Sequence, residues 1–179
     1  TAHLKEKFLR KIYSLCGAAV LASRSFQQFL KQSREWLLPY AVFCSLRDKH
    51  SADKRQWGVL YSYDASLAEQ YAHKENESVG YYYFAQYLLD RELSQAREYA
   101  HKRGVTLKGD IPIGVSPTSV DVWCAPHLYN LSASAGAPPD AFAEDGQNWG
   151  FPTYNWARMA EDGYDWWSRR LKKMARYFD

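Results

Sequence analysis

Val105-Thr-Leu-Lys-Gly-Asp-Ile-Pro-Ile-Gly-Val115 is a short run of apolar and β-branched residues that follows a helical pattern and a glycine. The helical pattern consists of apolar residues that recur on one face: Phe84, Tyr87, Leu88, Ala96, Tyr99 and Ala100. Gly104 then provides the left-handed conformation with which helices commonly end. A helix, a glycine turn and a β-branched run are typical of an α/β unit, so residues 105–115 are predicted to form a parallel-type strand.

The rest of the chain is predicted to be mostly helical. Residues 4–15, 25–38 and 40–47 carry helical apolar patterns, and Pro39 is expected to end or kink the helix before it. Two further helices are expected near the C-terminus, at about residues 155–161 and 167–178. The fold class is therefore mostly α with one parallel-type β segment. Because such a strand needs neighbours for its main-chain groups and the sequence offers none of similar quality, we interpret the chain as a piece of a larger α/β protein. A first residue that is Thr rather than Met fits that interpretation.

Composition excludes several classes of protein. The 179 residues are 24% charged with a formal net charge of +3 and mixed signs, which gives no electrostatic footprint for nucleic acid. The most apolar stretch, Tyr81 to Leu89, is interrupted by Gln86 and is too short to cross a membrane. A charged N-terminus gives no secretory signal, and three widely spaced cysteines form no disulfide framework, so a cytoplasmic location is expected. Cys124 and His127 lack a second half-site, so neither a metal nor another cofactor is expected.

Residues 116–153 form a long segment without periodicity that is rich in proline and aromatic residues. Segments of this length without secondary structure of their own are usually functional or disordered, and the aromatic content favours an ordered functional region. Trp and Tyr rings with one polar edge suit flat ligands such as sugars.

Four motifs in this order carry a family resemblance. They are Lys108-Gly-Asp-Ile-Pro-Ile-Gly-Val115, Ser119-Val-Asp-Val-Trp123, Ala135-Gly-Ala-Pro-Pro-Asp140 and Gly146-Gln-Asn-Trp-Gly-Phe-Pro-Thr-Tyr-Asn-Trp156. Together they resemble the 4-α-glucanotransferases, also called amylomaltases or disproportionating enzymes, and above all the branch with the plant cytosolic enzymes. The motif match covers residues 81–179, whereas residues 1–80 fit that family's helical insertions more loosely.

The resemblance implies an incomplete (β/α)₈ TIM barrel with helical insertions, because a whole barrel takes ~250 residues. Residues 1–80 would be a helical insertion subdomain, and residues 81–179 a partial barrel with its third strand at 105–115. The family's nucleophile lies in an Arg-x-Asp-His motif, which is expected just after Asp179, so no catalytic residue is expected within the chain. The implied reaction is retaining transfer between α-1,4-glucans, in which one carboxylate attacks the anomeric carbon and a second carboxylic acid protonates the leaving oxygen.

The resemblance also implies a substrate-binding set for α-1,4-glucans and maltooligosaccharides. Its members are Asp110, Pro112, Asp140, Phe142, Gln147, Asn148 and Trp149. Asp110 would lie at the end of the barrel strand, where barrel enzymes place their sites. Read from the residues alone, Asp110 is also a common turn former, and Trp149 could be a buried structural residue.

Two alternatives from other classes stay open. The chain could be a self-standing helical module that binds glucan or another protein without chemistry. It could also be a small complete hydrolase that uses Asp110, Asp121, Asp140 and Asp145, although their spacing does not require them to converge. A partial barrel would expose the edge of residues 105–115, which predicts either self-association through that edge or a mostly helical structure in which the strand is poorly formed.

Overall fold

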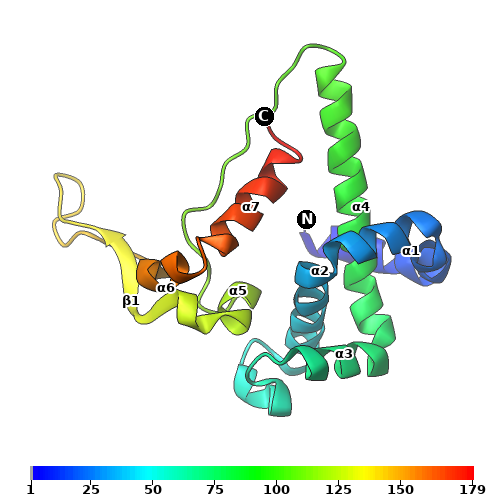
Figure 1. The fold of residues 1–179 in the computed structure, drawn as a ribbon, viewed down its shortest axis with the longest axis horizontal. Helices are drawn as coiled ribbons and strands as arrows, with labels where there is room; N and C mark the ends of the chain where they lie inside the picture. Colours follow the sequence, from blue (N-terminus) through cyan, green and yellow to red (C-terminus); the bar gives the residue numbers. More distant parts are fainter. Residues whose placement is uncertain (1) are drawn as a thin grey trace. The chain divides into compact units, whose positions relative to one another are not determined.

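The computed structural model describes residues 2–179, and in them helices dominate (Figure 1). The chain divides into two compact units, of which the first ends at Gln95 and the second spans Ala96–Asp179. The one sheet among the described residues is antiparallel and has two strands. The expectation of a mostly helical chain is therefore confirmed, while the division at residues 80 and 81 stays a prediction.

The first unit consists of helices joined by short turns. They are α1 (Ala2–Ala22), α2 (Arg24–His50), the 3₁₀ segment η1 (Lys54–Leu60), α3 (Ala65–Lys74) and most of α4 (Asn76–His101). Its aromatic core contains Phe26, Phe29, Leu37 and Tyr87, all buried. Tyr87 meets both phenylalanine rings, with centroids 5.5 Å from Phe26 and 5.4 Å from Phe29. These contacts hold α2 against α4.

Pro39 does not break its helix. Of the two predicted outcomes, an end or a kink, the end at Leu38 is wrong, because α2 continues from Arg24 to His50. Proline removes one main-chain donor and crowds the preceding turn. Its neighbours Leu37, Ala41 and Val42 are nevertheless fully buried, and the free energy of this packing outweighs the local cost.

The second unit combines short helices with a hairpin. After α4 come α5 (Val120–Cys124), η2 (Pro126–Leu128), strands β1 (Tyr129–Ala137) and β2 (Gln147–Tyr154), then α6 (Trp156–Glu161) and α7 (Asp165–Ala175). The buried core of this unit contains Val115, Val122, Leu128, Tyr129 and Met159. In Figure 1 the hairpin and its connecting loop extend away from α6.

Residues 105–115 do not form the predicted parallel-type strand. Gly104 has the expected left-handed conformation, with φ of +68°, but an extended segment without strand pairing follows it and runs alongside α7 in Figure 1. A parallel strand needs another strand beside it, and the described residues contain only the β1–β2 sheet. The main chain is bonded elsewhere: Leu107 O accepts from Asp179 N at 3.0 Å, and Pro112 O accepts from Arg170 Nη2 at 3.0 Å. Of the two outcomes predicted for an unpartnered strand, the structure has the poorly formed one.

Residues 116–153 are more regular than expected. They contain α5, η2, β1 and most of β2, and the strands pair antiparallel from Tyr129 opposite Tyr154 to Ala137 opposite Gln147. The register shifts on either side of Ser134, which makes the hairpin irregular. Short polar and small residues in β1 hide its strand character, because β-propensity comes mainly from branched and aromatic side chains. No helix in residues 2–179 has the length and apolar character that a membrane crossing needs.

Candidate functional site

Strand β2 carries three side chains that contact one another in sequence. Gln147, Trp149 and Phe151 are joined by a hydrogen bond and a ring contact, although Gly150, with φ of +72°, interrupts the regular strand geometry between the last two. Trp149 donates from Nε1 to Gln147 Oε1 at 2.9 Å, and its ring is 44% exposed. The indole is thus held at its polar edge while much of its surface stays accessible, which is the geometry of an aromatic platform.

Asn148 serves the hairpin itself. Its Oδ1 accepts from Ser134 Oγ at 2.5 Å and from the main-chain N–H of Gly150 at 2.9 Å. Gly150 follows with φ of +72°, a conformation that glycine adopts at little cost. The predicted role of Asn148 in sugar binding would therefore depend on its amide nitrogen, because its oxygen already accepts two hydrogen bonds.

Asp140 shapes the loop that joins the strands. Its Oδ1 accepts from the main-chain N–H groups of Phe142 at 2.8 Å and Ala143 at 2.9 Å. The Asp140 N–H in turn donates to Ala143 O at 3.1 Å. This closed turn carries the Phe142 ring, which is 99% exposed. Asp140 thus orients the loop, and Phe142 offers its ring to the solvent.

Asp110 lies on the extended segment beside α7 and is exposed. The segment is held at three places around it, through Leu107, through the Arg170 bond to Pro112 O, and through Val115 in the core. The Arg170 guanidinium also lies over the Trp166 ring at 5.0 Å. An exposed carboxylate on a restrained segment can accept hydrogen bonds from hydroxyl groups of a ligand.

Phe151 connects the two parts of the site and was not predicted from sequence. Its ring centroid lies 5.9 Å from that of Trp149, and the ring packs on the main chain at Gly114. The structure thereby brings Trp149 and the Asp110 segment together through a shared neighbour. The alternate spacing of Gln147, Trp149 and Phe151 is the signal that could have identified it.

Trp156, Trp166 and Trp167 form an aromatic cluster with Tyr154. Trp166 and Trp167 meet at 5.0 Å, and Tyr154 lies 5.2 Å from Trp167. Trp156 stacks on Trp167 with an interplanar angle of 15° and a centroid separation of 6.2 Å, although it is half exposed. Burial raises the pKa of Tyr129, whose ring also contacts Trp166. These rings serve the core of the unit rather than a platform.

Two of the four carboxylates of the hydrolase alternative, Asp121 and Asp140, are engaged separately. Asp121 Oδ1 accepts from Trp166 Nε1 at 3.1 Å, whereas Asp140 caps its own loop. Neither contact involves a second carboxylate, and a retaining hydrolase needs two carboxyl groups ~5–5.5 Å apart. The geometry gives this alternative no support.

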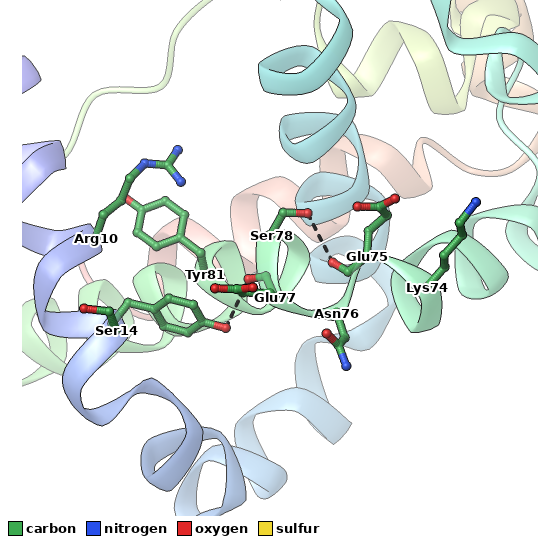
Figure 2. A pocket seen from close by; sticks show the side chains of 9 residues that line it. Arg10, Ser14, Lys74, Glu75, Asn76, Glu77, Ser78 and Tyr81 are labelled. Carbon is green, nitrogen blue, oxygen red and sulfur yellow. Dashed lines mark hydrogen bonds between the residues drawn. The ribbon is translucent and has the colours of Figure 1, made fainter.

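The first unit has a hollow of its own, of about 480 Å³, between α1 and the turn from α3 into α4 (Figure 2). Tyr13 donates to Glu77 O at 3.1 Å across it, and the Arg10 guanidinium lies 4.1 Å from the centroid of the Tyr81 ring. Ser78 donates to Glu75 O at 3.1 Å, as Figure 2 shows. None of the predicted site residues lines this hollow.

The whole chain, residues 1–179, matches the family of 4-alpha-glucanotransferases, and it belongs to that family. The family match is wider than the motifs in residues 81–179 indicated. The chain is 47% identical over 180 residues to 4-alpha-glucanotransferase DPE2 of Oryza sativa subsp. japonica, covering 97% of this chain and 19% of that protein. It is 33% identical to the 4-alpha-glucanotransferase of Chlamydia muridarum, covering 98% of this chain and 33% of the relative.

Solved structures agree with this assignment. The amylomaltase of Streptococcus agalactiae in complex with acarbose superposes with a TM-score of 0.76 and 31% identity, over 87% of this chain and 33% of that one. The amylomaltase of Corynebacterium glutamicum gives a TM-score of 0.72 at 26% identity, over 97% of this chain and 23% of that one. The chain thus spans about a fifth to a third of the length of these relatives.

Proposed function

We propose that this chain is a segment of a 4-α-glucanotransferase and supplies part of its glucan-binding surface. The observation that carries the proposal is the half-exposed Trp149 ring, anchored through Nε1 to Gln147, on a hairpin in contact with the Asp110 segment. A pyranose ring presents C–H groups on its face, so an indole can pack on it while carboxylates and amides accept and donate hydrogen bonds at its edge. Membership of the family supports glucans as the ligand.

Within this proposal the predicted residues have distinct tasks. Trp149 packs on a sugar ring, and Phe142 closes over a neighbouring sugar from the loop that Asp140 shapes. Asp110 and Gln147 accept hydrogen bonds from sugar hydroxyls, and Asn148 donates with its amide nitrogen. Pro112 restrains the segment, because its carbonyl is bonded to Arg170 and its ring limits the main chain.

The proposed reaction transfers α-1,4-glucan segments between maltooligosaccharides by the retaining mechanism. The nucleophile and the acid are proposed to lie outside residues 1–179, in a (β/α)₈ barrel to which this segment contributes. The amylomaltase of Streptococcus agalactiae is in complex with acarbose, which supports an oligosaccharide-like ligand for this surface. Cytoplasmic location and self-association through the edge of residues 105–115 stay predictions.

Maltoheptaose titration of the ¹⁵N-labelled chain tests the binding role. We expect the Trp149 indole Nε1–H signal, assigned with Trp149→Phe, to shift saturably. We expect Trp149→Ala to weaken binding by roughly ten-fold or more, because the apolar area that the sugar covers is lost. Trp156→Ala is the matched control, because that ring is similarly exposed but stacks on Trp167. An unshifted Trp149 signal, or equal losses for both variants, would exclude the platform.

Maltotriose incubation distinguishes the proposal from the hydrolase alternative. We expect the chain to leave maltotriose unchanged, because the reactive carboxylates are proposed to lie elsewhere. Release of maltose or glucose would instead favour a small complete hydrolase. The other alternative, a self-standing helical module, predicts no turnover either: it would bind maltooligosaccharides if its ligand is glucan and would not respond to them if its ligand is another protein.

A further inference from the structure

We propose that Phe151 is a positioning residue for glucan binding: its ring, lodged between Gly114 and Trp149, fixes the indole relative to the segment that carries Asp110. This inference rests on the proposed function and deepens it, since it explains how two elements far apart in sequence form one binding surface.

The first contact is between the Phe151 ring and the main chain at Gly114, where no side chain intervenes. A methyl group built on the Cα of Gly114 would lie 2.5 Å from Phe151 Cγ, so the ring occupies the space that a side chain would need. Gly114 does not have the positive φ of Gly104 or Gly150. Its missing side chain, rather than an unusual conformation, is therefore what the ring requires.

The second contact is with Trp149. The planes of the two rings are inclined by 33° with centroids 5.9 Å apart, which lies within the range for offset aromatic pairs. The indole is consequently restrained twice, by Gln147 at Nε1 and by Phe151 at the ring. Removing Phe151 would take away the ring contact and leave the Gln147 hydrogen bond in place.

The segment under the ring is itself held in place. A methyl group on Gly109 would lie 2.5 Å from Phe178 Cδ2, so a second aromatic ring covers the main chain directly before Asp110. Arg170 donates a hydrogen bond to Pro112 O, which lies between the ring contacts at Gly109 and Gly114. Phe151 therefore packs the hairpin against a segment that Phe178 and Arg170 already hold in place. Through this contact the Trp149 ring is restrained as well.

A sugar that packs on Trp149 while bonding to Asp110 needs both groups at a constant separation. Preorganised groups lose less conformational entropy on binding than mobile ones. Releasing one immobilised side chain weakens affinity by roughly three- to ten-fold. The size of the effect distinguishes a positioning residue from a group that contacts the sugar.

The test uses Phe151→Ala, which removes the ring that packs on Gly114, and Gly114→Ala, whose added methyl group displaces that ring. Phe151→Tyr keeps the ring and serves as the conservative variant. Phe8→Ala removes a 67% exposed ring from α1 in the other unit and is the matched control. For each variant, the Trp149 indole signal and the Asp110 amide signal are recorded in the free chain, followed by a maltoheptaose titration.

We expect both alanine variants to shift the two signals in the free chain and to raise the dissociation constant for maltoheptaose by roughly three- to ten-fold. Phe151→Tyr and Phe8→Ala should leave both readouts close to the wild type. The Asn130 amide, at the far end of the hairpin, should stay unchanged in every variant, which shows that the strands remain paired.

The contrary results are separate for the two proposals. If the wild-type chain binds maltoheptaose, two results overturn the positioning role alone. They are unshifted Trp149 and Asp110 signals in the alanine variants, or a dissociation constant in those variants that equals that of the wild type. A wild-type chain that does not bind maltoheptaose overturns the proposed function and with it the role of Phe151 in glucan binding.

Discussion

Asp179 is bonded twice to Leu107: its main-chain N–H donates to Leu107 O at 3.0 Å, and its carboxylate Oδ2 accepts from Leu107 N at 2.9 Å. The same carboxylate is paired with His101 at 2.9 Å and Arg97 at 3.5 Å. Residues 72 positions apart are thereby joined three residues before Asp110.

The pH dependence of this tie follows from the Asp179 carboxylate. The Leu107 N–H, then the His101 bond, lowers the pKa of Asp179 below its usual 3.8. A lowered pKa stabilises the fold above 3.8, and this contribution is lost as the pH falls through the lowered value. We expect the Leu107 amide signal to follow a transition whose midpoint lies below pH 3.8. The Asp179→Asn variant should lack that transition, and Asp165→Asn, on exposed α7, should keep it. A midpoint at or above 3.8 would contradict the assignment.

The Asp121–Trp166 bond is expected to stabilise the second unit. Asp121→Ala leaves the partly buried Trp166 Nε1–H without its acceptor, at a cost of about 1–3 kcal/mol in the free energy of unfolding. Asp121→Asn keeps an acceptor oxygen and should cost less. Urea denaturation measures both, with exposed Asp145→Ala as the control. Equal losses for the Ala and Asn variants would show that the hydrogen bond does not contribute.

Cys124 is expected to react slowly with disulfide reagents. Burial, followed by the nearby Asp121 charge, raises the pKa of its thiol to about 12. Because the thiolate is the nucleophile, the reaction at pH 8 should be at least ~100-fold slower in the folded chain than in denaturant. The measurement uses a chain with Cys16→Ser and Cys44→Ser, so that only Cys124 can react. Comparable rates in both states would contradict the raised pKa.

Ser45 is expected to anchor the first unit. It is 2% exposed, and its hydroxyl is bonded to Tyr71 Oη at 3.0 Å and to Ser78 Oγ at 2.7 Å. Ser45→Ala removes a shared partner from two hydroxyl groups and should cost about 1–3 kcal/mol in the free energy of unfolding. Ser14→Ala, whose hydroxyl only bonds its own exposed helix, is the control in the same denaturation experiment. A loss no larger than that of the control would contradict the role of the network.

Local sequence patterns predicted the helices well, but they did not predict how the helices are affected by the residues that pack around them. The apolar face of residues 84–100 and the turn at Gly104 are both present in the structure. Pro39 shows the opposite case, because its local preference was overridden by burial of the residues around it. Local preferences are worth at most a few kcal/mol, so tertiary packing can reverse them.

The sequence motifs were enough to identify the family and to predict candidate residues around Asp110, Asp140 and Trp149. This was possible because glycines, prolines and aromatic residues recur at fixed positions within those short segments. The three-dimensional structure was needed to show that residues 105–115 are unpaired, that residues 129–154 form a hairpin, and that Phe151 lies on Gly114. Strand pairing, and the packing of an aromatic ring on a glycine, both need a partner that is distant in the sequence. A local sequence pattern does not specify which distant residue that partner is.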